Sequence, residues 1–201
     1  MVQRNAERTK SAILRAAEDL FARRGFERTS LQQIGEAAGV ARSTPAYFFK
    51  TKQQLYDTVL GNALERGRAA MQPAFEAALS APSPEHALEA AVDGILSFLA
   101  HDQNYVLLMQ REALAERPSL AALLADEGLT DARSAWAHAL GDDDPEHFFL
   151  ELSALTWFPF AHDSTVVAAL GFDPRDPAFL ERHRERIVQL FRQSRRLMPR
   201  R

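Results

Sequence analysis

Residues 29–56, TSLQQIGEAAGVARSTPAYFFKTKQQLY, contain two short helix patterns joined by a glycine. Ser30 begins a capping-box pattern, and Gly39 supplies the left-handed residue that commonly ends a helix. A second helix is predicted to begin near Arg42, because Pro45 can occupy a first helical turn without a partner for its nitrogen. Two short helices joined in this way are a helix-turn-helix, whose second helix enters the major groove of DNA.

The polarity of the second helix separates a DNA-reading helix from an ordinary pair of packed helices. Pro45 and Phe49 share one face at helical spacing, which suits packing against the preceding helix. Polar side chains and one aromatic lie on the other side, a combination that fits readout of base edges. A helical hairpin without a role in DNA binding remains the alternative, because glycine turns between helices are common. The face predicted to contact DNA consists of Arg42, Ser43, Thr44 and Tyr47.

The charge is unevenly divided along the chain. Residues 1–70 contain 12 Lys and Arg against 7 Asp and Glu, a net charge of +5. Residues 71–201 contain 12 against 20, a net charge of −8, which brings the total to −3. A basic N-terminal third on an acidic body is typical of a small DNA-binding domain joined to a second domain. A basic surface that contacts only solvent is the alternative.

The stretch GVARSTPAYFFKTKQQLY resembles the signature of the tetracycline-repressor (TetR) family of bacterial regulators. With GFERTSLQQIGEAAGV upstream, the resemblance covers about residues 8–60. Pro45 stands where Leu is usual, and Ala46 where Tyr is usual. That tyrosine often holds a phosphate in the family, which puts such a contact at residue 46 in question and makes Tyr47 the candidate to replace it. The matching residues are Gly39, Val40, Arg42, Thr44, Phe49, Lys50, Lys52, Leu55 and Tyr56.

The hydrophobic pattern predicts an all-α protein of about nine helices, and the resemblance implies how they are divided into domains. A helix-turn-helix DNA-binding domain is expected at 1–51, and a connecting helix with an effector-binding and dimerisation domain at 52–201. The implied function is transcriptional regulation, commonly repression, by a homodimer that binds a palindromic operator in double-stranded DNA and is released by an unidentified small molecule. A regulator that acts through protein partners or as an activator, without an effector, is the alternative.

Three further residues are expected to contact DNA beside the outward face of the second helix. Ser30 and Lys52 would hold phosphates, and Phe48 would pack at the edge of the groove. The complete expected set is Ser30, Arg42, Ser43, Thr44, Tyr47, Phe48 and Lys52.

Hydrophobic periodicity predicts helices through the rest of the chain and no strands. Pro73 is expected to kink or end the helix that begins at Lys52. The expected helices cover about 6–24, 52–71, 83–99, 103–115, 119–128, 131–140, 145–161 and 177–197.

The C-terminal domain has to supply a dimer interface and an effector site if the resemblance holds. The last two helices look like those that pair across a two-fold axis in TetR-like proteins, and a monomer is the alternative. Plain core packing is the alternative for each expected ligand contact. The expected interface residues are Leu152, Ile187, Leu190 and Phe191, and the expected ligand contacts are Tyr105, Met109 and Trp157.

Other functional classes find little support in the sequence. Neighbouring residues on a helix do not face each other, so His101–Asp102 and His162–Asp163 are not ready catalytic dyads. Asp142–Asp144 with His147 is the one group of possible metal ligands, and a solvated helix start explains it more simply. We therefore expect no catalysis, cofactor or metal. The chain has no cysteine, no apolar run of about 20 residues and no signal-peptide pattern, so we expect a cytoplasmic protein without a membrane anchor.

Overall fold

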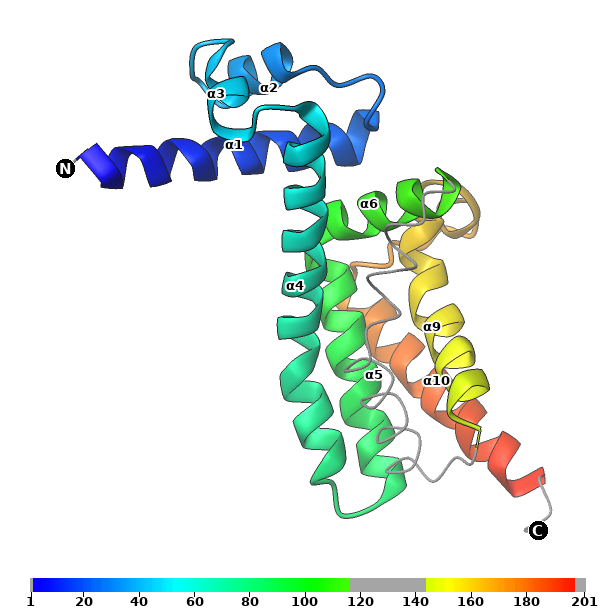
Figure 1. The fold of residues 1–201 in the computed structure, drawn as a ribbon. Coiled ribbons are helices and arrows are strands. Elements are labelled where there is room, and N and C mark those ends of the chain that lie inside the picture. Colours follow the sequence, from blue (N-terminus) through cyan, green and yellow to red (C-terminus); the bar gives the residue numbers. More distant parts are fainter. Residues whose placement is uncertain (1, 116–143, 198–201) are drawn as a thin grey trace. The chain divides into compact units, whose positions relative to one another are not determined.

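The computed structural model describes residues 2–115 and 144–197. These ranges form eight α-helices and one π-helical turn, with no strand among them (Figure 1). The expected all-α fold is thereby confirmed, whereas the helices expected at 119–128 and 131–140 lie outside the described residues. The elements are α1 (Val2–Arg24), α2 (Leu31–Ala37), α3 (Thr44–Phe49), α4 (Lys52–Leu79), α5 (Pro84–His101), α6 (Gln103–Leu114), α9 (Pro145–Ala161), the π-helical turn η1 (Asp163–Val167) and α10 (Pro177–Leu197).

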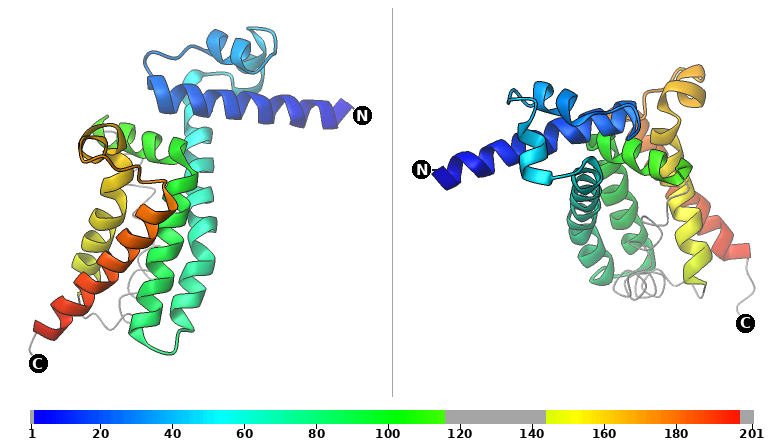
Figure 2. Two further views of the ribbon diagram at one scale, coloured as in Figure 1. Left: turned by 180° about the vertical axis from the view of Figure 1, so that it is seen from behind. Right: turned by 45° about the horizontal axis from the view of Figure 1, so that its top comes forward.

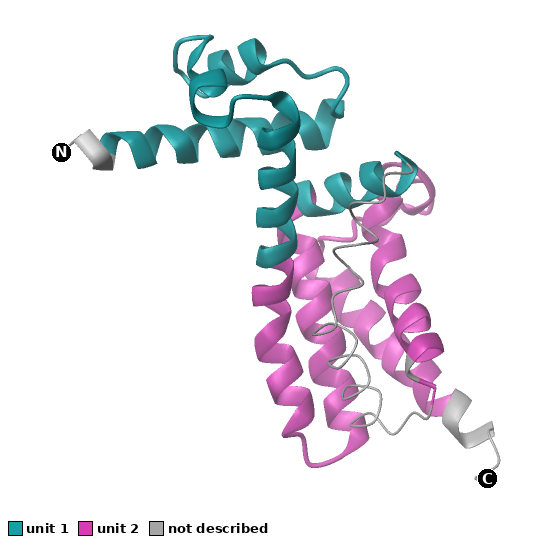
Figure 3. Cartoon of the chain, viewed as in Figure 1, with its two compact units in different colours: residues 1–66, 104–116 teal, residues 67–103, 117–201 magenta. Residues whose placement is uncertain are grey.

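The chain divides into two compact units, which Figure 3 shows in different colours. Unit 1 contains residues 1–66 and 104–116, and unit 2 contains residues 67–103 and 117–201. Helix α4 therefore belongs to both units along its length, and α6 belongs to unit 1 although it follows α5 of unit 2. The sequence suggested a DNA-binding domain at 1–51, followed at 52–201 by a connecting helix and a C-terminal domain.

Unit 1 is built around the apolar stripe of α1. Ile13, Ala17 and Phe21 are completely buried there, and α1 packs against both α2 and α3. The ring of Tyr56 from α4 meets the edge of Phe21 with 4.9 Å between the ring centroids. Burying aromatic side chains contributes strongly to a small core, and edge-to-face pairs add to it. Helix α1 thus forms the base on which the two shorter helices are held.

Unit 2 is organised around α5, which packs against α10 and α9 (Figure 2). The second half of α4 also approaches α5 closely, because a Cβ atom added at Gly94 would lie only 2.2 Å from the Cβ of Ala74. Arg184 of α10 pairs with Asp93 of α5 at 3.3 Å, at the edge of this packing. Small residues on α4 and α5 therefore allow the two backbones to come together.

A kink or an end of the helix was expected at Pro73, and the expected end is wrong. Helix α4 continues through this residue and ends at Leu79. Proline removes one hydrogen bond from the helix ladder and crowds the preceding turn. Pro73 is exposed, so its ring faces solvent, whereas the next residue, Ala74, is buried beside α5. Tertiary packing of this segment outweighs the local preference of proline.

Candidate DNA-binding surface

The start of α2 is held by the expected capping box. The Ser30 Oγ accepts a hydrogen bond from the Gln33 backbone N–H at 3.2 Å, and the Ser30 N–H donates to the Gln33 Oε1 at 2.9 Å. This reciprocal pair satisfies two donors that a helix start otherwise leaves open. Ser30 is exposed, and its own hydroxyl proton is not used by the cap. Its hydroxyl group remains able to donate, and the phosphate contact of Ser30 stays a prediction.

The turn between α2 and α3 depends on close approach at Gly35. An added Cβ atom there would lie 3.1 Å from the Ala41 carbonyl oxygen and 3.3 Å from the Pro45 Cδ. Gly39 has a φ of 68°, the left-handed conformation expected for the end of α2. The proline at position 45 thus packs directly against a buried glycine, and the two residues together set how tightly α3 lies on α2.

Helix α3 has the two faces predicted from its sequence. Pro45 and Phe49 are buried, which confirms their expected role in packing. Tyr47 is 84% exposed, and its ring meets the edge of the half-buried Phe48 with 5.5 Å between the centroids. Ser43 is exposed at the start of α3 and makes no side-chain cap hydrogen bond. Hydroxyl groups and an aromatic ring therefore stand on the solvent side.

The guanidinium group of Arg42 forms an ion pair in this conformation. Its Nη2 lies 2.6 Å from the Glu36 Oε1 of α2, in a pair whose side chains remain 71% and 50% exposed. The carboxylate fixes the direction of the guanidinium without burying it, and neutralises a charge that DNA phosphates would otherwise attract. Glu36 therefore competes with DNA for the arginine that is predicted to read a base. The spacing of Glu36 and Arg42 in the sequence does not indicate this contact.

Lys52 is also engaged within unit 1. Its Nζ donates to the Phe26 carbonyl oxygen at 3.0 Å and lies 4.2 Å from the centroid of the Phe26 ring. An ammonium group has three donors, so this bond leaves others for a phosphate. The phosphate contact of Lys52 stays a prediction. The structure adds a second role, because Lys52 ties the start of α4 to the loop after α1.

Two contacts that hold α6 within unit 1 could not be found from sequence spacing. The Arg111 Nε and Nη2 of α6 donate to the Ala22 and Arg23 carbonyl oxygens at the end of α1, each at 2.6 Å. The Tyr56 hydroxyl donates to the Glu112 Oε1 at 2.5 Å, and Glu112 is only 2% exposed. We call these contacts the α6 clasp. Its members are nearly 60 to 90 residues apart, so no local pattern relates them.

The expected ligand contacts are divided between the two units. Tyr105 and Met109 belong to α6 in unit 1, where Tyr105 is half-buried and Met109 is buried, whereas Trp157 is half-buried in α9 of unit 2. Whether these side chains meet one ligand stays a prediction.

The expected dimer residues are placed mainly in the protomer core. Leu152, Ile187 and Phe191 are no more than 4% exposed. A side chain already covered by its own protomer has little surface left for a partner, so these three are core residues. Leu190, in contrast, is 44% exposed. Helix α9 presents two further large apolar side chains to solvent, Leu150 and Phe158. On α9 the sequence could not separate buried from exposed positions, because this helix is apolar on nearly all sides.

The acidic group near α9 serves as a helix cap. The Asp144 Oδ1 accepts a hydrogen bond from the His147 backbone N–H at 3.2 Å, which lowers the pKa of this carboxyl, and Asp142 and Asp143 lie outside the described residues. In the part of the chain that is described, no three His, Asp or Glu residues are grouped to hold a metal ion.

The described helices also include none long and apolar enough to cross a bilayer.

Comparison with known proteins identifies relatives of this chain. Residues 13–59 match the model of the bacterial regulatory proteins of the tetR family. The transcriptional regulator RutR of Escherichia coli K12 is 30% identical over 189 residues, 90% of this chain and 87% of RutR. The transcriptional repressor BepR of Brucella suis is 33% identical over 99 residues, 49% of this chain and 46% of BepR.

A solved structure agrees at the level of the fold. The structure of AibR in complex with isovaleryl coenzyme A and operator DNA superposes with a TM-score of 0.69 at 16% identity, covering 90% of this chain and 97% of AibR. The helix-turn-helix geometry, the family match and the similarity to RutR over most of both chains lead to one conclusion. The chain belongs to the TetR family of bacterial transcriptional regulators.

Proposed function

We propose that this protein is a repressor that binds a palindromic operator as a homodimer and leaves it when a small molecule binds. The observation that carries the DNA-binding part is the outward face of α3, where Ser43 and Tyr47 are exposed while Pro45 and Phe49 anchor the helix. Hydroxyl, guanidinium and aromatic groups on one helix face are suited to base edges and the thymine methyl group. The work of the protein is then binding rather than catalysis, and it takes place at the bacterial chromosome in the cytoplasm.

The roles of the DNA-facing residues follow from their positions. Arg42 is proposed to leave Glu36 and donate to a guanine, with Ser43, Thr44 and Tyr47 beside it. Ser30 is proposed to hold a phosphate at the start of α2, where the helix dipole also favours an anion. Lys52 holds a second phosphate with its remaining donors, and Phe48 supports the ring of Tyr47 at the groove edge. Phosphate contacts fix the register, and the α3 contacts supply specificity.

Dimerisation is proposed to use the exposed apolar side chains of α9 and α10. Leu150 is 63% exposed and Phe158 is 47% exposed on α9, and Leu190 is 44% exposed on α10. Large apolar side chains that one protomer leaves exposed are candidates for an interface. A two-fold dimer presents two copies of α3 to half-sites about 34–36 Å apart, which is the reason for a palindromic operator.

The α6 clasp supports control by a ligand. Arg111 and Glu112 hold the C-terminal half of α6 to α1 and α4, within the DNA-binding unit. The N-terminal end of α6 follows α5 of unit 2 after a single residue, Asp102. A ligand that shifts α5 would therefore pull on a helix attached to the DNA-binding unit. A preference of about 1–3 kcal/mol for one state would change operator affinity about 5- to 150-fold.

Selection of genomic fragments with the purified protein, followed by footprinting and salt titration, tests the proposal. We expect one short palindrome, protected at a stoichiometry of one dimer, with affinity that falls steeply as salt rises. Folded protein that enriches no sequence above its non-specific binding would overturn the proposal. Transcription from the protected promoter in vitro separates repression from activation, and release of fluorescent operator DNA across a compound library tests for an effector.

Arg42→Ala gives the direct test of base reading. Loss of a bidentate contact with guanine should reduce operator affinity by about 1–3 kcal/mol and relax the preference at one base pair. Measurements on operators carrying each base at that position show the relaxation. Equal weakening on all sequences would instead make Arg42 a phosphate contact.

A further inference from the structure

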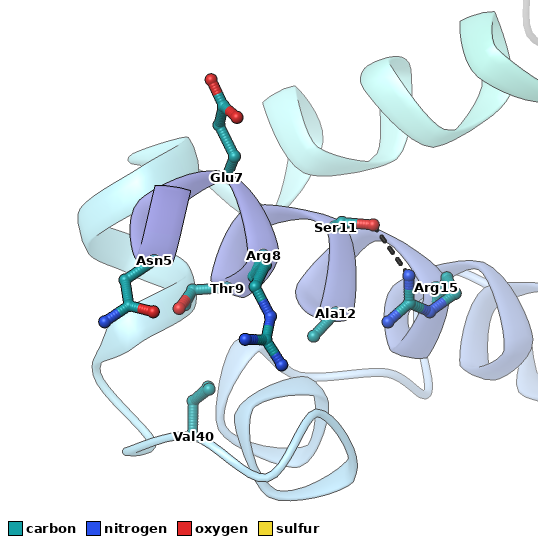
Figure 4. A pocket seen from close by; sticks show the side chains of 8 residues that line it. All are labelled: Asn5, Glu7, Arg8, Thr9, Ser11, Ala12, Arg15 and Val40. Atoms are coloured by element: carbon teal, nitrogen blue, oxygen red, sulfur yellow. Dashed lines mark hydrogen bonds between the residues drawn. The ribbon is translucent and has the colours of Figure 1, made fainter. Parts of the chain in front are cut away.

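An open groove of about 860 Å³ runs along α1 beside the turn between α2 and α3 (Figure 4). Seven of its lining residues belong to the first two thirds of α1, and the eighth is Val40, four positions before α3 begins. The lining is mostly polar and offers guanidinium, amide and hydroxyl donors. The residues are Asn5, Glu7, Arg8, Thr9, Ser11, Ala12, Arg15 and Val40.

Arg8 has no partner in this groove. It is exposed, and it makes no hydrogen bond or ion pair in the part of the chain that the structure describes. The cations expected to contact DNA are both engaged, Arg42 with Glu36 and Lys52 with the Phe26 carbonyl. The Arg8 guanidinium is therefore a cation beside the helix-turn-helix whose five donors are all available.

The side chains are arranged so that the groove favours an anion. Figure 4 shows Arg8 extending from α1 toward the loop that carries Val40, while Glu7 points away from that loop. The Arg15 Nη1 donates to the Ser11 hydroxyl at 2.8 Å, which leaves the other guanidinium donors of Arg15 for a ligand. The carboxylate that lines the groove thus does not neutralise its Val40 side.

The length and position of the groove fit a strand of DNA backbone. Asn5 and Arg15 are separated by about 15 Å along the helix at a rise of about 1.5 Å per residue. Phosphates of one strand follow each other at about 3.4 Å along the duplex axis, so a segment of backbone fits where a single small ion would leave most of the length empty. Val40 lies only two residues before Arg42, which brings one wall of the groove to the start of the DNA-reading segment.

We infer that this groove is a binding site for the DNA backbone, with Arg8 as its principal phosphate ligand. The inference rests on the proposed operator binding and extends it. The phosphates bound by Arg8 lie outside the bases read by α3, so the groove lengthens the footprint and adds affinity without adding sequence preference. Arg15 and Asn5 supply further donors along the same strand.

The test compares Arg8→Ala with Arg24→Ala in the full-length protein. Both substitutions remove an exposed arginine from α1, but Arg24 lies at the opposite end of the helix and outside the groove. Salt titrations on the operator and on scrambled DNA give the slope of log affinity against log salt. Each phosphate contact contributes about 0.9 to that slope in duplex DNA. Ethylation interference on operator phosphates identifies the backbone positions that the protein needs.

We expect Arg8→Ala to reduce the slope by about 0.9 on both DNAs and to leave the ratio of the two affinities unchanged. Arg8→Lys should keep most of the slope, and Arg24→Ala should keep all of it. One or more phosphates outside the half-site should be needed by the wild type and not by Arg8→Ala.

An unchanged slope for Arg8→Ala, with normal operator binding by the wild type, would contradict DNA binding in the groove and leave the proposed function intact. A wild type that binds no operator would overturn both. Equal thermal unfolding of the variants checks the fold, which an exposed side chain without partners should not affect.

Discussion

At the scale of single residues, the pair between Arg42 and Glu36 is the feature most open to test. The carboxylate holds the guanidinium at 2.6 Å, so a phosphate has to compete with it for Arg42. Glu36→Gln should raise affinity for scrambled DNA more than for the operator and so lower the specificity ratio. Exposed pairs contribute about 0.2–1 kcal/mol, so the change should not exceed about fivefold. Fluorescence anisotropy on both DNAs at several salt concentrations measures it.

Asp19→Asn is the matched control for Glu36→Gln. Asp19 pairs with Arg23 at the same 2.6 Å and at similar exposure, but both residues belong to α1 and neither is expected to contact DNA. The specificity ratio of this variant should equal that of the wild type. If both variants change the ratio alike, the effect of Glu36 is one of net charge and not of its contact with Arg42.

At the scale of elements, the contact between α2 and α3 depends on Gly35. Its missing side chain leaves room for the Ala41 carbonyl and the Arg42 Cα, both of which an added Cβ would approach to 3.1 Å. Backbone atoms cannot rotate away as a side chain can, so Gly35→Ala should cost about 1–3 kcal/mol of unfolding free energy. It should also weaken operator binding by displacing α3. Urea unfolding and operator titration measure the two effects.

Gly61→Ala provides the control for Gly35→Ala. Gly61 lies inside α4, and a Cβ added there meets no atom within 4 Å. Alanine is favoured over glycine in a helix by up to about 1 kcal/mol, so this variant should be more stable than the wild type. Similar loss of stability in both variants would show that the approach of α3 is not the cause, because helix propensity favours alanine at both positions.

At the scale of the whole molecule, the first question is how one protomer meets another. Leu190→Glu should weaken the dimer, because it places a charge in the surface proposed to be covered by the partner. Operator binding should weaken with it, since a single protomer reads only one half-site. Sedimentation velocity gives the dimer dissociation constant, and footprinting gives the operator affinity. Leu79→Glu, at a comparable 48% exposure on α4, should leave the dimer intact.

The second question at this scale is how α6 stays with the DNA-binding unit. Arg111 satisfies carbonyl oxygens at the end of α1, where a helix leaves acceptors open and favours a cation. Arg111→Ala should increase hydrogen exchange in α6 and at the C-terminal turn of α1, while the middle of α1 stays protected. Exchange followed by mass spectrometry measures this. The same increase in Arg24→Ala would indicate general loosening of α1 and contradict a specific clasp.

Local sequence determined much of the helix-turn-helix. The capping box at Ser30, the left-handed Gly39 and the packing face of Pro45 and Phe49 all depend on residues within about one helical turn of each other. The ends of α10 were predictable for the same reason, because Pro177 starts a strongly amphipathic helix. Geometry between near neighbours in the chain is encoded in their spacing, so the amino-acid sequence alone is enough to predict these features.

Tertiary structure decided what each of these elements contacts. Leu150 and Leu152 are both apolar residues of α9, yet one is 63% exposed and the other 1% exposed, because the packing of α5 and α10 against α9 covers one side of the helix. The pairing of Arg42, the retention of Lys52 by Phe26 and the α6 clasp likewise join groups whose spacing follows no helical or turn period. Their energies come from burial and charge in three dimensions, and these depend on which surfaces meet.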